Sequence, residues 1–253
     1  MTAADRGAAI SAVIIVGECA PHLEAVLAAL DFCAERLVLD SGPGPGVAAV
    51  ASAAGVRVER QPFLGYGPQK ARAVALASHD WILSIDADEI LDAEAAAAIR
   101  GLDLSDPAAC WEVRRRTFIG SREIHHGPWR DDRVLRLFNR TRAAFKPLLV
   151  HEQVAAASAP RLLPGSMLHY SYVDLVDVLA RTLRYAPLKA TLIRDRGERV
   201  RLWTLPFRAL AVFLKAFLLR GGWRDGAAGF VIGLARAIDS TLPRALLRFD
   251  RRG

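Results

Sequence analysis

The first half of the chain alternates short apolar runs with longer amphipathic segments. Strands are predicted for four apolar runs, at 11–16, 36–39, 56–59 and 81–86. Helices are predicted for the segments between or after them, at 22–30, 47–54, 70–78 and 93–101. Strand–helix repeats of this length are typical of a mostly parallel central sheet flanked by helices. Because such sheets bind ligands beyond the carboxyl ends of their strands, we predict an α/β fold with Asp40, Asp86 and Asp88 at the functional edge.

The run Trp81 to Glu89, with the sequence WILSIDADE, is the strongest chemical signal in the chain. It predicts a buried strand that stops at Asp86, with Asp88 two residues later. Side chains alternate along a strand, so the two carboxylates point the same way. Such a pair can hold Mg²⁺ or Mn²⁺, which in turn can hold a diphosphate. A simple strand followed by a helix start, capped by Asp92, is the structural alternative.

The pattern changes after residue 101. Strands are predicted at 110–115 and 133–138, on either side of a polar, His-rich segment that contains Trp129. The segment at 203–220 is strongly apolar, is broken by Gly221-Gly222, and is followed by a second apolar helix at 227–238. We therefore predict a catalytic domain at 1–202 and a basic helical hairpin at 203–253 that packs on a membrane or on the protein core.

Charge separates these two regions. The chain of 253 residues has a formal net charge of +7, but residues 181–253 hold 16 Lys and Arg against 5 Asp and Glu. An anionic partner is expected at this end, and its apolar content favours an anionic membrane over nucleic acid. Three cysteines without ligand-like spacing, and the lack of a signal-peptide pattern, predict a cytoplasmic protein at the inner membrane.

Five motifs follow one another along the chain: Asp40-Ser41-Gly42, the segment GYGPQKARAVALASHDWILSIDADE, the segment HGPWRDDRVLRLF, Val150-His151-Glu152 and Leu168-His169-Tyr170-Ser171. In this order and spacing they resemble glycosyltransferase family 2, and in particular its lipopolysaccharide core β-1,4-glucosyltransferase subgroup. The segment from Leu214 to Gly229 is also similar to the tail of that subgroup. The resemblance covers about residues 11 to 240.

The resemblance implies a GT-A fold, a nucleotide-sugar donor, a divalent metal and inversion at the anomeric carbon. It implies that Asp88, assisted by Asp86, reaches the metal or the nucleotide ribose, and that His151 is a candidate metal ligand. His169 could also be a ligand, a phosphate contact or a structural residue. The implied acceptor is a lipid-linked or cell-envelope glycan such as lipopolysaccharide core.

The resemblance also implies a catalytic base and further donor contacts. Asp132 stands where the family has the base that accepts the acceptor proton, and the adjacent Asp131 stays open as an alternative. Either carboxylate could instead pair with a neighbouring arginine. Asp40, Gln69 and Lys70 match positions that help to bind the nucleotide-sugar. Trp129 is interpreted either as a sugar-stacking face or as a core residue.

Two stretches depart from the family pattern. Val16-Gly17-Glu18-Cys19 replaces a usual Asn-Glu pair, and Pro43-Gly44-Pro45-Gly46 replaces a usual Ser-Thr-Asp-Gly. Both normally contact the base and ribose, so a catalytically inactive binding module is the main alternative. Residues 44–49 also match the GxGxxA pattern of dinucleotide-binding loops, and Glu59 stands roughly where an acidic residue would bind the ribose. An NAD(P)-dependent oxidoreductase is therefore a weaker alternative.

Overall fold

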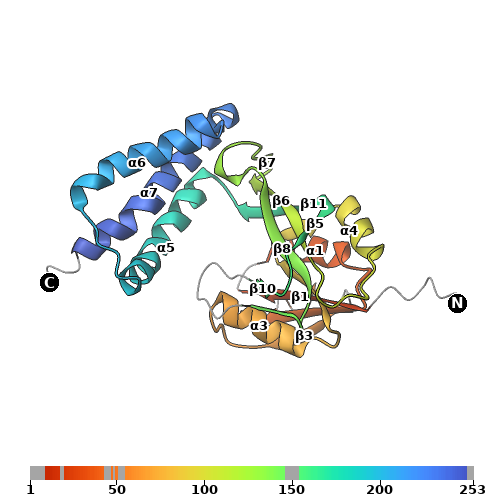
Figure 1. Ribbon diagram of the computed structural model, residues 1–253. Helices are drawn as coiled ribbons and strands as arrows, with labels where there is room; N and C mark the ends of the chain where they lie inside the picture. The colour runs from red at the N-terminus through yellow and green to blue at the C-terminus, as the bar shows by residue number, and fades with distance from the viewer. Residues whose placement is uncertain are drawn as a thin grey trace, which may run out of the picture. The chain divides into compact units, whose positions relative to one another are not determined.

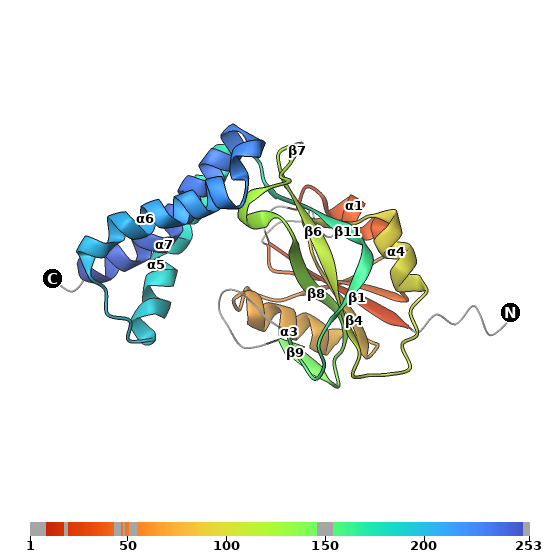
Figure 2. The same cartoon turned by 45° about the horizontal axis from the view of Figure 1, so that its top comes forward.

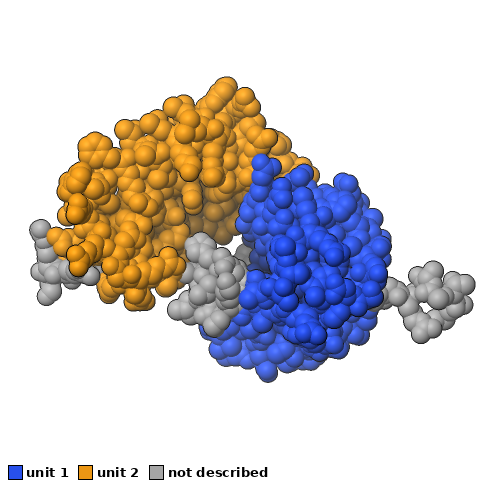
Figure 3. Space-filling model, in the orientation of Figure 1, with its two compact units in different colours: residues 1–115, 131–169 blue, residues 116–130, 170–253 orange. Residues whose placement is uncertain are grey.

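The computed structural model describes residues 9–17, 20–42, 47, 49–50, 55–145 and 154–249. The chain forms two compact units, which Figure 3 colours separately. Unit 1 comprises residues 1–115 and 131–169, and unit 2 comprises residues 116–130 and 170–253. Strand β6 crosses the boundary after residue 115 and strand β11 crosses the boundary after residue 169, so each begins in unit 1 and ends in unit 2.

A mixed sheet forms the centre of the fold (Figures 1 and 2). Within the described residues its strand order is β3-β2-β1-β4-β8-β6-β11-β5, with β7 paired to β6. The strands are β1 (Ile10–Val16), β2 (Glu35–Asp40), β3 (Arg57–Arg60), β4 (Trp81–Asp86), β5 (Glu89–Leu91), β6 (Cys110–Ile119), β7 (Arg122–Glu123), β8 (Asp132–Asn139) and β11 (Arg161–Tyr172). A small separate ladder joins β9 (Ala143–Phe145) to β10 (Val154–Ala156).

The α/β class predicted from the alternating pattern is confirmed, with one difference in the sheet. Among the described residues, parallel pairing joins β3, β2, β1 and β4. Beyond β4, strand β8 pairs in antiparallel fashion with both β4 and β6, and β5 pairs in antiparallel fashion with β11.

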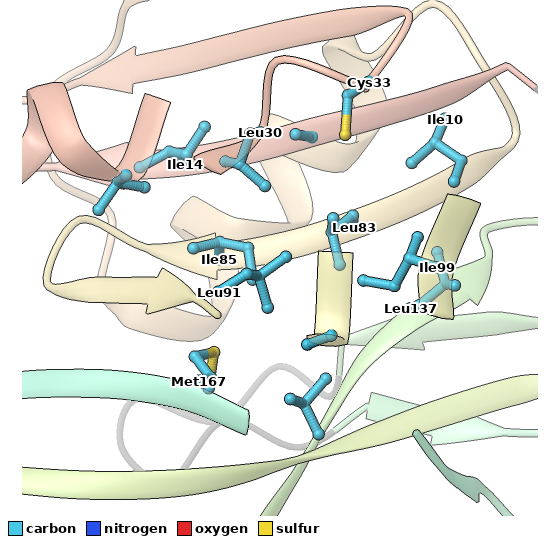
Figure 4. Packing of buried hydrophobic residues seen from close by; sticks show 14 of the residues in the cluster. Ile10, Ile14, Leu30, Cys33, Leu83, Ile85, Leu91, Ile99, Leu137 and Met167 are labelled. Carbon is cyan, nitrogen blue, oxygen red and sulfur yellow. The ribbon is translucent and has the colours of Figure 1, made fainter. Parts of the chain in front are cut away.

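Both faces of the parallel part are covered by helices. The helices of unit 1 are α1 (Leu23–Ala29), α3 (Tyr66–Leu76) and α4 (Ala93–Arg100). Side chains of β1 alternate between two buried clusters: Ile10 and Ile14 join α1 and α4, whereas Val13 joins α3. Figure 4 shows the first cluster, in which Leu83 and Ile85 of β4 point towards the same layer. Burial on both faces explains why these strands read as continuous apolar runs.

Most predicted elements of unit 1 are present with shifted ends. Helix α3 begins at Tyr66, one turn before the predicted start at residue 70, directly after Gly65 at a φ of 96°. Strand β6 extends to Ile119 because β7 pairs with its far end. The helix predicted at 47–54 lies largely outside the described residues.

Unit 2 is built on three long helical segments that lie side by side (Figures 1 and 2). They are α5 (Leu175–Asp195), α6 (Leu205–Leu214, continued by a π-helical turn at Lys215–Leu219) and α7 (Ala227–Phe249). Helix α7 packs against both α5 and α6. At Gly229 a Cβ atom would lie 1.7 Å from the carbonyl oxygen of Gly222, so only glycine permits this approach. The boundary predicted after residue 202 falls between α5 and α6, inside unit 2, because α5 packs on α7.

The helical run at 202–219 has an apolar surface that the described chain does not cover. It is long and apolar enough to cross a membrane by length and composition, with a mean hydropathy of 1.6, and only 6% of it is buried. Trp203, Phe207 and Leu210 are 67%, 69% and 56% exposed. Their spacing places them on one helix face, with the exposed Arg208 and Lys215 on the same run.

Candidate active site

The carboxyl ends of β2 and β4 place Asp40 and Asp86 on either side of β1. Asp40 pairs in register with Val16, and Asp86 pairs with Ile15. Both carboxylates therefore lie at the edge of the sheet where ligands of parallel sheets bind. This arrangement agrees with the placement predicted from the strand pattern.

Asp86 is held by two buried cations. Its Oδ1 lies 2.7 Å from Nζ of Lys70, and its Oδ2 accepts a hydrogen bond of 2.8 Å from Nη2 of Arg136. The Lys70 and Arg136 side chains are only 3% and 4% exposed. Burial by itself would raise the pKa of Asp86, but these two cations outweigh it and hold the pKa well below its usual range. Asp86 is thus ionised and both of its oxygens are engaged.

Glu89, the first residue of β5, is a fully buried carboxylate beside Asp86. Its Oε2 accepts a hydrogen bond of 3.0 Å from the backbone N–H of Asp86. Its Oε1 is bound by Arg136 and lies 3.5 Å from Nη1 of Arg115. A buried carboxylate is costly unless it is paired and hydrogen-bonded, and Glu89 meets both conditions. It connects the end of β4 to arginines on β8 and β6.

Asp132 begins β8 directly opposite Arg115 of β6. Nε and Nη2 of Arg115 donate to Oδ2 of Asp132 at 2.8 and 2.6 Å. The neighbouring Asp131 is exposed and has a φ of 58°, in the left-handed region that turns the chain into β8. Of the two candidate bases, Asp132 is therefore the one that joins the Glu89 network. Among the described residues, no ion pair joins Asp132 to its sequence neighbours Arg130, Arg133 or Arg136; Arg133, for example, lies 3.5 Å from Glu112.

Asp88 lies in the turn between β4 and β5, and among the described residues its carboxylate forms no ion pair with a lysine or an arginine. Its Oδ2 is 3.6 Å from Nε2 of His169 on β11. Burial, followed by the nearby charges of Asp86 and Glu89, raises the pKa of Asp88 to about 7. Burial also lowers the pKa of His169 to about 4, so its imidazole is neutral at pH 7.

These two side chains fit a divalent metal. A cation would supply the positive charge that the Asp88 carboxylate lacks, and a neutral imidazole is the form that binds metals. Among the described residues, no group of three or more His, Cys, Asp or Glu side chains forms a ready-made cage. Mg²⁺ and Mn²⁺ bound with a diphosphate need no such cage, because phosphate and water oxygens complete the coordination. His151, the third predicted ligand, lies outside the described residues.

Asp40 and Gln69 are both buried, but they differ in whether a side-chain oxygen is left without a hydrogen bond. Oδ1 of Asp40 accepts the N–H of Gly42 at 2.8 Å. Its buried Oδ2 has no hydrogen-bond partner among the described residues, although Nε of Arg60 lies 3.8 Å from it. The amide of Gln69 is fully engaged: it accepts from the N–H of Leu64 and donates to the carbonyl of Gln61. Gln69 therefore shapes the segment before α3, and Asp40 keeps an acceptor oxygen at the sheet edge.

The His-rich segment that contains Trp129 belongs to unit 2, where Asp225 binds it through hydrogen bonds. His126 Nδ1 lies 3.1 Å from Oδ1 of Asp225, which also accepts the backbone N–H of His126 through Oδ2. Trp129 stacks on Tyr172, with ring centroids 5.1 Å apart, beside the buried cluster of α5 and α7. These contacts are those of a packed residue, and so they agree with the interpretation of Trp129 as a core residue.

Sequence reasoning missed Glu89, Arg115 and Arg136 as parts of this site. Arg136 lies in the apolar run of β8, and Glu89 is the last residue of the strongest motif. A charged residue inside a strand that is buried on both faces is a signal that it has a partner. Which partner it has could not be read from the sequence, because the contacts join β4, β5, β6 and β8.

Comparisons with known proteins assign the family. No family model matches the chain. A lipopolysaccharide core biosynthesis glycosyltransferase, LpsC from Rhizobium meliloti (strain 1021), is 30% identical over 244 residues, which cover 93% of this chain and 90% of that protein. An uncharacterized glycosyltransferase from Rickettsia felis is 27% identical and covers 94% of this chain and 89% of that protein.

Similarity to solved structures is more limited. Glucosyl-3-phosphoglycerate synthase from Mycobacterium tuberculosis, in complex with Mn²⁺, uridine diphosphate and glucosyl-3-phosphoglycerate, has a TM-score of 0.36 and 25% identity. The match covers 47% of this chain and 47% of that one, which is about half of each. The likeness to LpsC extends along nearly the whole chain and agrees with the family 2 motifs at β4 and β8. The chain therefore belongs to the glycosyltransferase family that includes LpsC.

Proposed function

We propose that the protein is a metal-dependent, inverting glycosyltransferase that transfers a sugar from a nucleotide-sugar to a lipid-linked or cell-envelope glycan. The observation that carries this proposal is the network in unit 1 that joins Asp88, through the adjacent Glu89, to Asp132. A single displacement needs support for a leaving diphosphate and a base for the acceptor hydroxyl. The network supplies a candidate for each. The name of LpsC supports lipopolysaccharide core as the class of acceptor.

In the proposed reaction, Asp132 takes the proton of the acceptor hydroxyl. The hydroxyl oxygen forms a bond to the anomeric carbon on the face opposite the diphosphate. The bond from that carbon to the phosphate oxygen breaks, and its electron pair leaves with the nucleoside diphosphate. One attack from the opposite face inverts the configuration. The divalent metal, when bound, neutralises charge on the diphosphate.

The remaining predicted residues act around this step. Asp88 and His169 hold the metal, and Asp86 fixes the turn that carries Asp88. Asp40 offers to the nucleoside its Oδ2, which accepts no hydrogen bond from the described residues. Gln69 and Lys70 serve donor binding indirectly, because Gln69 holds the segment before α3 and Lys70 holds Asp86.

We place the protein at the cytoplasmic face of the inner membrane, with the exposed face of α6 against anionic lipid. Trp203, Phe207 and Leu210 supply apolar insertion, and the exposed Arg208 and Lys215 supply attraction to anionic headgroups. A lipid-linked acceptor resides at the same surface. This location would raise the effective concentration of the acceptor around the enzyme.

The first test is calorimetric binding of UDP-, GDP-, dTDP- and ADP-sugars, each with Mn²⁺ and with EDTA. We expect one donor to bind with Mn²⁺ and to lose most of its affinity in EDTA. Asp103→Ala, a change of an exposed carboxylate in unit 1, is the matched control and should bind as the unaltered protein does. A folded protein that binds none of the four donors would favour a non-catalytic binding module.

A further inference from the structure

Arg115 has no part in the steps above, yet it is the residue that touches the proposed base. Two of its N–H groups, from Nε and Nη2, converge on the same atom, Oδ2 of Asp132. The described residues donate no hydrogen bond to Oδ1, so Oδ1 is the oxygen that remains to accept a proton. Because the carboxyl group is planar and its Cβ atom is set by the backbone, holding Oδ2 also determines where Oδ1 lies.

The arginine is itself held in place from two sides. The register between β6 and β8 sets it opposite Asp132, and its Nη1 lies 3.5 Å from Oε1 of the fully buried Glu89. Burial opposes the charged form of Arg115, but Glu89 and Asp132 outweigh it and raise its pKa, so the guanidinium stays charged. Glu89 in turn is bonded to the backbone of Asp86 at the end of β4.

Positioning of this kind has a large effect on a base. A general base works only when its accepting oxygen lies within hydrogen-bond reach, about 2.6–3.2 Å, of the hydroxyl oxygen whose proton it takes. A displacement of about 1 Å can cost about 10²-fold in rate. Asp132 is partly exposed and stands at the start of a strand, directly after a residue in the left-handed region, so its own backbone does not hold its side chain.

Building on the proposed function, we propose that Arg115 is a positioning residue that holds Oδ2 of Asp132 and presents Oδ1 to the acceptor hydroxyl. Glu89 anchors Arg115 to the β4–β5 turn, which carries Asp88. The base and the metal-binding turn are thereby fixed relative to each other within unit 1. Arg115 acts on the acceptor proton through Asp132 and does not contact the donor.

The test compares Arg115→Gln with Arg114→Gln. Arg114 is the exposed neighbour on the other face of β6, so the same change there serves as a matched control. Donor affinity is measured by calorimetry with Mn²⁺ and the nucleotide-sugar that the unaltered protein binds, and turnover as nucleoside diphosphate release with truncated lipopolysaccharide. Arg115→Gln should lower kcat by about 10²-fold and leave donor affinity within about twofold. Arg114→Gln should change neither quantity.

A double-mutant cycle with Asp132→Asn separates positioning from a general structural role. If Arg115 acts through Asp132, adding Arg115→Gln to Asp132→Asn should lower kcat by less than about twofold further. Additive losses would overturn the proposal, because a structural defect would act in either background. Arg115→Lys keeps the charge but loses the fork, and we expect its kcat to lie between those of the unaltered protein and Arg115→Gln.

The outcomes also distinguish this inference from the proposed function. If Asp132→Asn lowers kcat and Arg115→Gln does not, the base is correct and the positioning role is wrong. If Asp132→Asn is fully active, the proposed base is wrong, and so is a role for Arg115 that depends on it. Melting temperatures of all variants identify any loss that comes from unfolding.

Discussion

The two units break the usual rule of burial in opposite ways. Unit 1 buries charged groups: Glu89, Lys70 and Arg136 are almost inaccessible. Unit 2 exposes large apolar groups along α6, among them Phe207 at 69% and Leu219 at 83%. Buried charge costs free energy unless it is paired, and an apolar face of this kind commonly marks a binding surface. In the function that we propose, the first departure serves chemistry and the second serves location.

The largest effect is expected from Asp88→Ala. Removal of the carboxylate that lacks a cationic partner should lower metal-dependent turnover by about 10³-fold or more, because several kcal/mol of charge stabilisation are lost. The measurement is nucleoside diphosphate release with Mn²⁺, with Asp103→Ala as the control. Unchanged turnover would mean that the metal does not bind at the β4–β5 turn.

The second effect tests which of two adjacent carboxylates is the base. Asp132→Asn should reduce kcat by about 10²–10⁴-fold while donor affinity stays largely intact, since a general base contributes on this order. Asp131→Asn, the matched change at the exposed neighbour, should have a small effect. Should Asp131→Asn instead carry the loss, the base lies one residue earlier than we propose.

The third effect concerns the apolar surface of unit 2. Replacing Trp203, Phe207 and Leu210 by Ser should weaken binding to anionic liposomes by about 10²-fold or more, because each buried side chain contributes on the order of 1.5–3 kcal/mol. Co-sedimentation with vesicles that contain phosphatidylglycerol measures this. The control replaces Val173 and Val176 by Ser; they are 76% and 73% exposed and lie at or just before the start of α5 rather than in the helical run at 202–219. Equal loss in both variants would mean that exposure alone, and not the α6 face, determines binding.

The smallest effects are changes in the free energy of unfolding, which should have opposite signs for Asp86→Asn and Asp88→Asn. Asp86→Asn leaves Lys70 and Arg136 short of a buried anion and should reduce the free energy of unfolding by about 3 kcal/mol. Asp88→Asn should instead stabilise the metal-free protein at pH 8. Urea unfolding in EDTA measures both.

The stability difference between Asp88→Asn and the unaltered protein should depend on pH. The pKa of Asp88 is raised to about 7 in the folded protein, so the folded state binds more protons than the unfolded state between about pH 4 and pH 7. Stability is therefore lost as the pH rises through this window. The advantage of Asp88→Asn should be small near pH 4, grow up to about pH 7 and stay constant above it. If the stability advantage of Asp88→Asn did not vary with pH, it would come from packing and not from the titration of Asp88.

The strand pattern already determined much of this protein. Apolar runs that end on Asp40 and Asp86 established the α/β class and the edge where both carboxylates lie, because strand period and burial are local properties. The motifs at β4 and β8 also indicated the glycosyltransferase family. The basic, apolar end of the chain was equally visible, since composition requires no fold.

Only the tertiary structure decided how the charges are paired. Asp132 is bound by Arg115, which is 17 positions away in the sequence, and Asp86 by Lys70 and Arg136, which lie on α3 and β8. Such pairs depend on sheet order and register, which the sequence pattern does not specify. For the same reason the two aspartates of one motif differ: Asp86 is surrounded by cations, whereas Asp88 faces a neutral imidazole and a buried carboxylate. Long-range packing therefore turned two similar residues into a structural anchor and a candidate metal ligand.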